Sequence, residues 1–106
     1  SIEFSNYDAA APLINDARAA EHAFQAAKKI VGAENIITDA PKSMGADDFA
    51  DFLAVVPGIY CFVGTQSGES TAFNHHHEQF DIDEKGLLIA AELHVTYALD
   101  YLANPF

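Results

Sequence analysis

The chain has 106 residues, the length of one small domain, and half of them are apolar, so it is not a disordered tail. Five Lys and Arg stand against 16 Asp and Glu, which gives a formal net charge of −11. Phosphate binding needs clustered cations, so the charge excludes a nucleic-acid partner and an anionic membrane surface. The single cysteine, Cys61, lies in an apolar run and predicts a buried, reduced thiol in a cytoplasmic, membrane-free protein.

The first part of the chain predicts a strand, a helix and a second strand. Residues 1–7 alternate apolar and polar side chains, as in a half-buried strand. A helix follows, with Asp16 as its N-cap and Gly32 as its stop. His22 falls on the polar side of that helix, so we expect it at the surface. Residues 35–39 then predict a short buried strand.

The middle of the chain predicts a second helix and a third strand. Asp47 and Asp48 suit the first turn of a helix because their charges oppose its dipole, and Pro57 ends it. The apolar face of this helix consists of Phe49, Phe52, Leu53 and Val56. Residues 59–64 form a continuous apolar run, which is typical of a fully buried strand.

The last predicted helix, residues 84–103, is apolar around most of its circumference. Its polar positions Glu92, Thr96 and Asp100 form only a narrow stripe, and a helix of this kind is normally surrounded. The preceding elements cannot easily enclose it, so we expect the chain to be the C-terminal part of a longer one. His94 on this helix is expected to be packed or hydrogen-bonded.

Three consecutive histidines precede this helix in the stretch "FNHHHEQFDIDE", residues 73–84. Short histidine tracts bind metals, respond to pH or are simply solvated. The residues alone favour the solvated loop and leave the other two interpretations open.

Three segments together resemble a known family. "PKSMGADDFADFLAVVPGIYCFVGT" (residues 41–65) and "NHHHEQFDIDEKGLLIAAELHVTYALDYL" (74–102) resemble the C-terminal end of the zinc-dependent N-acyl-amino-acid amidohydrolases. That family includes hippurate hydrolase, aminoacylase and carboxypeptidase-like metallopeptidases. "YDAAAPLIND" (7–16) resembles the return from the family's inserted lid domain, which commonly dimerises.

The resemblance implies an α/β fold divided in two. Residues 1–12 would end the lid domain with its last strand and a return linker. Residues 13–106 would form a βαβαβα C-terminal part of the catalytic domain. The parent enzyme would hold two zinc ions, or manganese or cobalt, and form a homodimer. Its glutamate general base would lie upstream, so we expect the isolated segment to be inactive.

The resemblance also implies site residues. The family's His-x-Pro-x-Phe pattern places a metal ligand at His76; Glu78 replaces the proline, which leaves His75 as an alternative. Asp47 stands where the family usually has Glu, which puts a direct role for it in doubt. The residues expected to shape the substrate pocket are Ser43, Met44, Gly45, Asp47, Asp48 and Gly64.

Three functions follow from these observations. The leading one is metal-dependent hydrolysis of an N-acyl amino acid or a small peptide-like amide by the full-length parent. The alternative is a non-catalytic module that binds a partner or self-associates through its exposed apolar surfaces. The third is a metal-binding or pH-responsive protein that uses the histidine tract without enzymatic activity.

Overall fold

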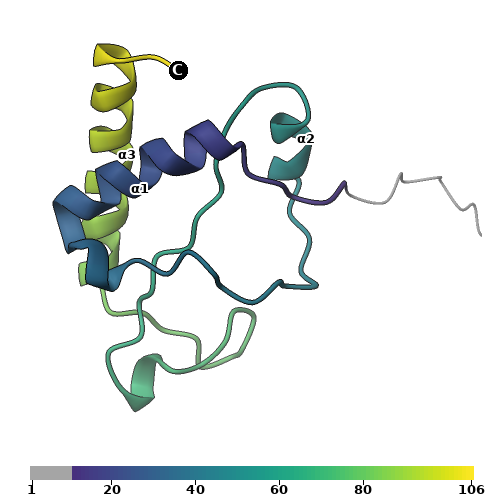
Figure 1. Cartoon of the computed structure of the whole chain (residues 1–106). Coiled ribbons are helices and arrows are strands. Elements are labelled where there is room, and N and C mark those ends of the chain that lie inside the picture. The colour runs from purple at the N-terminus through teal and green to yellow at the C-terminus, as the bar shows by residue number, and fades with distance from the viewer. Residues whose placement is uncertain (1–10) are drawn as a thin grey trace, which may run out of the picture.

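The computed structural model describes residues 11–106, and helices dominate it (Figure 1). Three α-helices, α1 (Ala17–Val31), α2 (Phe49–Leu53) and α3 (Lys85–Ala103), are joined by long connections. Two of these connections contain a short 3₁₀ turn, η1 (Ala33–Asn35) and η2 (Glu69–Thr71). The strand predicted within residues 1–7 lies outside the described residues.

Helix α1 begins and ends where the sequence predicts. The Asp16 carboxylate accepts hydrogen bonds from the backbone N–H groups of Arg18 at 2.9 Å and Ala19 at 3.0 Å, which satisfies two free donors of the first turn. At the other end Gly32 has φ 81°, a conformation that favours glycine, and its N–H donates to the Lys28 carbonyl. The helix predicted between Asp16 and Gly32 is confirmed.

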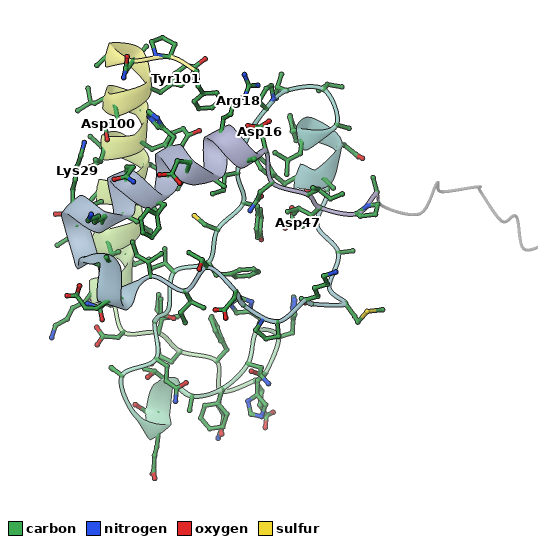
Figure 2. The ribbon with its side chains drawn as sticks, viewed as in Figure 1. Asp16, Arg18, Lys29, Asp47, Asp100 and Tyr101 are labelled. Carbon is green, nitrogen blue, oxygen red and sulfur yellow. The ribbon has the colours of Figure 1, made fainter. Side chains whose placement is uncertain are left out.

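Helix α1 packs across α3, and this pair forms the main contact between elements in residues 11–106 (Figure 1). The buried side chains of α1 are Ala19, Ala23 and Ala26, whose small size allows the two helices to approach closely. At the end of the contact, Lys29 Nζ lies 2.6 Å from the Asp100 carboxylate (Figure 2). The first and last long helices of the chain therefore contact each other directly.

Helix α3 confirms the last predicted helix, but the surface that it presents to α1 contains both apolar and polar side chains. The half-buried positions on the α1 side are Ile89, Leu93, Thr96, Tyr97 and Asp100. The opposite side carries four exposed apolar residues, Leu88, Val95, Leu99 and Leu102, which we call the outward face of α3. Among the described elements only α1 packs against α3, so this outward face is left uncovered. Within residues 11–106, no helix is long and apolar enough to cross a membrane.

Helix α2 is shorter than predicted and ends at Leu53, although backbone turns continue to Val56. Pro57 disfavours the helical conformation for the residue before it, which limits the helix at this end. Phe52 is exposed and stacks on Phe49 with ring centroids 5.9 Å apart, so the expected apolar face is only partly covered.

Neither strand predicted within the described residues forms. Within residues 35–39, Asn35 ends η1 and the following residues form neither helix nor strand. Residues 59–64 have no strand beside them. The Asn15 side chain takes the place of a partner by donating to the Tyr60 carbonyl at 3.0 Å and accepting from its N–H at 2.8 Å. A strand exists only as part of a ladder, and residues 11–106 supply no neighbouring strand. The βαβαβα arrangement is thus not formed in this structure.

Three single-residue predictions are resolved by the packing. His22 is half-buried against Tyr97 of α3 at 5.1 Å between ring centroids, so its predicted place at the surface was wrong. Cys61 is exposed, because its segment lacks the sheet that would bury it, so the predicted buried thiol was wrong as well. His94 Nδ1 lies 2.9 Å from the Ala90 carbonyl, which confirms a hydrogen-bonded histidine.

Candidate functional site

The three histidines lie in a compact loop, residues 73–80, which we call the His loop. It follows η2 and precedes α3, at the end of the molecule away from the C-terminus (Figure 1). Two backbone turns fold it: the His77 N–H donates to the Asn74 carbonyl at 3.1 Å, and the Phe80 N–H donates to the His77 carbonyl at 3.0 Å. These turns give the three histidines different surroundings.

His75 and His77 both pack on aromatic rings. The His77 ring stacks on Phe73 with centroids 4.6 Å apart, and its Nδ1 accepts a hydrogen bond from the Gln79 N–H. The His75 ring meets the Phe80 ring edge-on at 5.1 Å. Each of these imidazoles therefore helps to hold the loop together.

His76 differs in its backbone. Its φ is 68°, and it is the one non-glycine residue in the described part of the chain with positive φ. That conformation is uncommon for residues other than glycine, and it occurs often at functional sites. Within residues 11–106, no hydrogen bond or ring contact engages the His76 side chain. Its imidazole is the one of the three that the loop does not use for its own folding.

An open hollow of about 400 Å³ lies beside this loop. Its lining residues are Thr65, Gln66, Thr71, Ala72, Phe73, Asn74, His75 and Phe80. Amide and hydroxyl groups share this surface with two phenyl rings, and the hollow is wide open to solvent. None of the six predicted pocket residues lines the hollow.

The predicted pocket residues instead occupy a separate connection before and after α2. Met44 is fully exposed, and the Ser43 Oγ accepts a hydrogen bond from the Gly45 N–H at 3.0 Å. A side chain at Gly64 would meet no atom within 4 Å, so its surroundings are open. Asp48 occupies the N-cap position of α2 without a side-chain capping bond. These positions are accessible, and none of them belongs to the His loop or lines the hollow beside it.

Asp47 has structural partners. Its Oδ1 accepts from the Phe49 N–H at 2.8 Å, and its Oδ2 accepts from the Tyr60 hydroxyl at 3.1 Å (Figure 2). The hydrogen bond to Asp47 and the charge of that carboxylate raise the pKa of Tyr60, because ionising the phenol would remove the donor and place two negative charges together. Asp47 thereby ties the start of α2 to the segment around Tyr60.

The described residues do not complete a metal centre. Residues 11–106 contain no group of three or more His, Cys, Asp or Glu side chains placed to hold an ion. Stable zinc sites in proteins use at least three protein ligands, so residues 11–106 do not hold such a site by themselves.

The base of the connection that carries the His loop is not predicted from the sequence. The Asp83 N–H donates to the Thr65 carbonyl at 2.9 Å, which brings the two ends of the connection together. The signal was an aspartate just before the last helix, a common capping residue, whose partner Thr65 could not be found from the sequence.

Comparison with known proteins identifies the class to which this chain belongs. Residues 1–100 match the model of peptidase family M20/M25/M40, so the chain belongs to that family. The predicted resemblance to amidohydrolases and carboxypeptidases is thereby confirmed. No solved structure gives a significant match.

The chain is similar to several curated relatives. YhaA of Bacillus subtilis (strain 168), whose name describes an amidohydrolase, is 31% identical over 102 residues, which are 95% of this chain and 26% of that protein. Thermostable carboxypeptidase 2 of Saccharolobus solfataricus is 30% identical over 74 residues, 69% of this chain and 19% of that enzyme. IAA-amino acid hydrolase ILR1-like 4 of Arabidopsis thaliana is 30% identical over 92 residues, 86% of this chain and 21% of that protein. The chain thus spans about a quarter or less of the length of these relatives.

Proposed function

We propose that this chain is the C-terminal segment of a metal-dependent hydrolase that cleaves N-acyl amino acids or small peptide-like amides. Family membership and relatives named as an amidohydrolase, a carboxypeptidase and an amino acid conjugate hydrolase support this activity. The segment supplies one metal ligand and pocket loops, and the general base comes from another part of the full-length protein. The isolated segment has no activity of its own.

The observation that carries the proposal is the conformation of His76. It occupies the ligand position of the family motif, its backbone has φ 68°, and both neighbouring imidazoles are held by aromatic rings. The ring contacts tie His75 and His77 to the loop, whereas no ring contact within residues 11–106 ties His76, and on this ground we take His76 rather than His75 as the ligand.

The metal ions of the full-length protein would be two zinc ions, or manganese or cobalt, which suit imidazole ligands. A bound divalent ion supplies polarisation of the scissile carbonyl and activation of water. The contribution of this chain is to hold the His76 imidazole at a fixed place. The exposed loop of Ser43, Met44 and Gly45, with Asp47, Asp48 and Gly64, borders the substrate.

In the full-length protein, the rest of the catalytic domain provides the neighbouring elements that this segment lacks. We propose that residues 35–39 and 59–64 pair as strands there, with 13–106 belonging to the catalytic domain and 1–12 to the lid domain. Apolar side chains that are exposed here, such as Ile37 and Phe62, support this pairing because a sheet would bury them. The lid would join two copies into a cytoplasmic homodimer.

The test is made in the full-length protein with three variants, His75→Ala, His76→Ala and His77→Ala. Metal content and hydrolysis of N-acetyl and N-benzoyl amino acids are measured for each. We expect His76→Ala to lose metal and activity, while the other two keep their metal. Full metal and full activity in His76→Ala would overturn its role as a ligand.

A non-catalytic, self-associating module is the second candidate. The uncovered outward face of α3 favours it, because contiguous exposed apolar surface is typical of interaction sites. The same full-length preparation decides between the two: amide hydrolysis that requires metal excludes a purely non-catalytic role.

A further inference from the structure

Asp83 lies in the short segment that connects the His loop to helix α3. Its N–H donates to the Thr65 carbonyl at 2.9 Å, and its carbonyl accepts from the Gly86 N–H at 2.9 Å. Its carboxylate accepts from the Lys85 N–H at 3.0 Å, in the first turn of α3. Asp83 is therefore hydrogen-bonded both to Thr65, which precedes the loop, and to the first turn of α3, which follows it.

The surroundings of Asp83 favour its charged form. The Lys85 N–H, and after it the Ser67 hydroxyl, lower the pKa of Asp83. Gly86 is the buried residue of α3, and a Cβ there would lie 2.5 Å from the Thr65 Cγ2. The absence of a side chain at Gly86 lets the helix rest directly against Thr65.

Within the His loop, ring contacts between residues before and after His76 hold the loop together. Both ring pairs bracket His76 along the chain: Phe73 stacks on His77, and His75 meets Phe80 edge-on. A loop that is cross-linked internally moves as a unit, so its orientation depends mainly on how its two ends are held. The loop lies within the connection 65–83, whose two ends meet where the Asp83 N–H bonds to the Thr65 carbonyl.

We propose that Asp83 is a positioning residue for His76. It closes the base of the His loop against α3 and so sets where the His76 imidazole points. The inference rests on the proposed metal-dependent function, and it adds a residue that touches neither metal nor substrate. The physical analogy is with the outer partners of metal ligands, whose loss reduces metal affinity about 10–100-fold.

The experiment uses the full-length protein with Asp83→Ala, Asp83→Asn, His76→Ala and, as a matched control, Asp81→Ala. Asp81 lies nearby, but within residues 11–106 its carboxylate accepts only from the adjacent Ile82 N–H. Zinc affinity is measured by chelator competition, the ligand field by the visible spectrum of the cobalt-substituted protein, and loop order by amide exchange of residues 74–80 in the metal-free protein.

We expect Asp83→Ala to weaken zinc binding about tenfold or more, change the cobalt spectrum and speed amide exchange in the loop. Asp83→Asn keeps an acceptor oxygen for the Lys85 N–H and should recover much of the affinity, and Asp81→Ala should match wild type within twofold. Circular dichroism checks that each variant is folded; if Asp83→Ala is not, Ser67→Ala removes the hydroxyl that helps to lower the pKa of the same carboxylate and is expected to shift the same readouts less.

An unchanged affinity, cobalt spectrum and exchange rate in folded Asp83→Ala would overturn the positioning role while leaving the proposed function intact. The proposed function fails separately, and this inference with it, if wild type binds no metal or if His76→Ala binds it as tightly as wild type. These last outcomes are seen without any substitution at Asp83, so the two failures are distinguishable.

Discussion

At the scale of single residues, His22 is the least satisfied polar group of the α1–α3 contact. Its ring meets Tyr97, Tyr101 and Phe106, while its Nε2 is buried without a hydrogen-bond partner in the described structure. A buried polar atom without a partner costs about 1–3 kcal/mol. This position therefore combines favourable ring packing with an unfavourable nitrogen.

The two contributions can be separated by substitution. His22→Phe keeps an aromatic ring and removes the unpaired nitrogen, so we expect the free energy of unfolding to stay equal or rise by up to about 1 kcal/mol. His22→Ala removes the ring as well and should lower it by about 1–3 kcal/mol. Urea unfolding followed by circular dichroism measures both. A clear loss of stability in His22→Phe would mean that the imidazole has a partner in solution.

Asp83 predicts a dependence of stability on acid. Its pKa is lowered below the ordinary value of 3.8, first by the Lys85 N–H and then by the Ser67 hydroxyl. The folded chain therefore binds this proton less readily than the unfolded chain. The resulting stabilisation is present above the unfolded-state pKa of about 4 and disappears as the pH falls through the lower folded-state pKa.

We expect Asp83→Asn to lose part of the acid destabilisation of wild type between about pH 4 and pH 2. Thermal unfolding at a series of pH values measures this, and Ser67→Ala should show an intermediate slope. Identical slopes in wild type and Asp83→Asn would show that the carboxylate has no special partner.

At the scale of elements, the N-cap of α1 can be tested in isolation. Asp16 accepts from two backbone N–H groups, and loss of such a cap typically costs about 0.5–2 kcal/mol. We expect Asp16→Ala to destabilise the chain by about 1 kcal/mol, and Asp16→Ser, which can still cap, by much less. Chemical unfolding measures both variants. Equal losses in the two would point to the charge of Asp16 rather than to its capping bonds.

The Lys29–Asp100 pair joins α1 to α3 at 2.6 Å, but Lys29 remains 58% exposed. Water and salt screen such a pair, so a double-mutant cycle with Lys29→Ala and Asp100→Ala should give a coupling of about 0.2–1 kcal/mol. We expect this coupling to shrink between low salt and about 1 M salt. A coupling that does not change with salt would argue for contacts other than charge.

The elements also show which features a sequence can predict. Helix α1 was predictable because its cap at Asp16 and its stop at Gly32 are local signals. Residues 59–64 have the composition of a buried strand, but a strand needs a neighbour that residues 11–106 do not provide. His22 was misplaced for a related reason, since its burial depends on rings from α3 that are distant in sequence.

The candidate site divides in the same way. The three histidines lie in a loop before the last helix, as the sequence predicts, and the aromatic contacts of His75 and His77 distinguish them from His76, whose role as a ligand stays a prediction. The predicted pocket residues do not line the hollow beside the His loop, and the spacing along the chain carries no information on how two loops meet. The connection between Thr65 and Asp83 was equally invisible in the sequence.

At the scale of the whole molecule, the chain lacks a large apolar core. The fully buried apolar residues of the described part are the four alanines Ala19, Ala23, Ala26 and Ala50. The outward face of α3 exposes 64% of Leu88 and 75% of Leu102. Uncovered apolar surface of this kind tends to find a partner, either another part of a longer chain or another molecule.

We therefore expect the isolated 106-residue chain to associate as its concentration rises, measured by sedimentation velocity. Leu99→Glu with Leu102→Glu places charges on the outward face and should shift the chain toward monomer, while leaving the α1 contact on the other side unchanged. Glu92→Gln, an exposed polar change on the same helix, is the control. In the full-length protein, where we propose that this face is covered, the same two charges should instead lower the free energy of unfolding by several kcal/mol, because buried charges lack partners. A wild-type chain that stays monomeric at all concentrations would contradict this account.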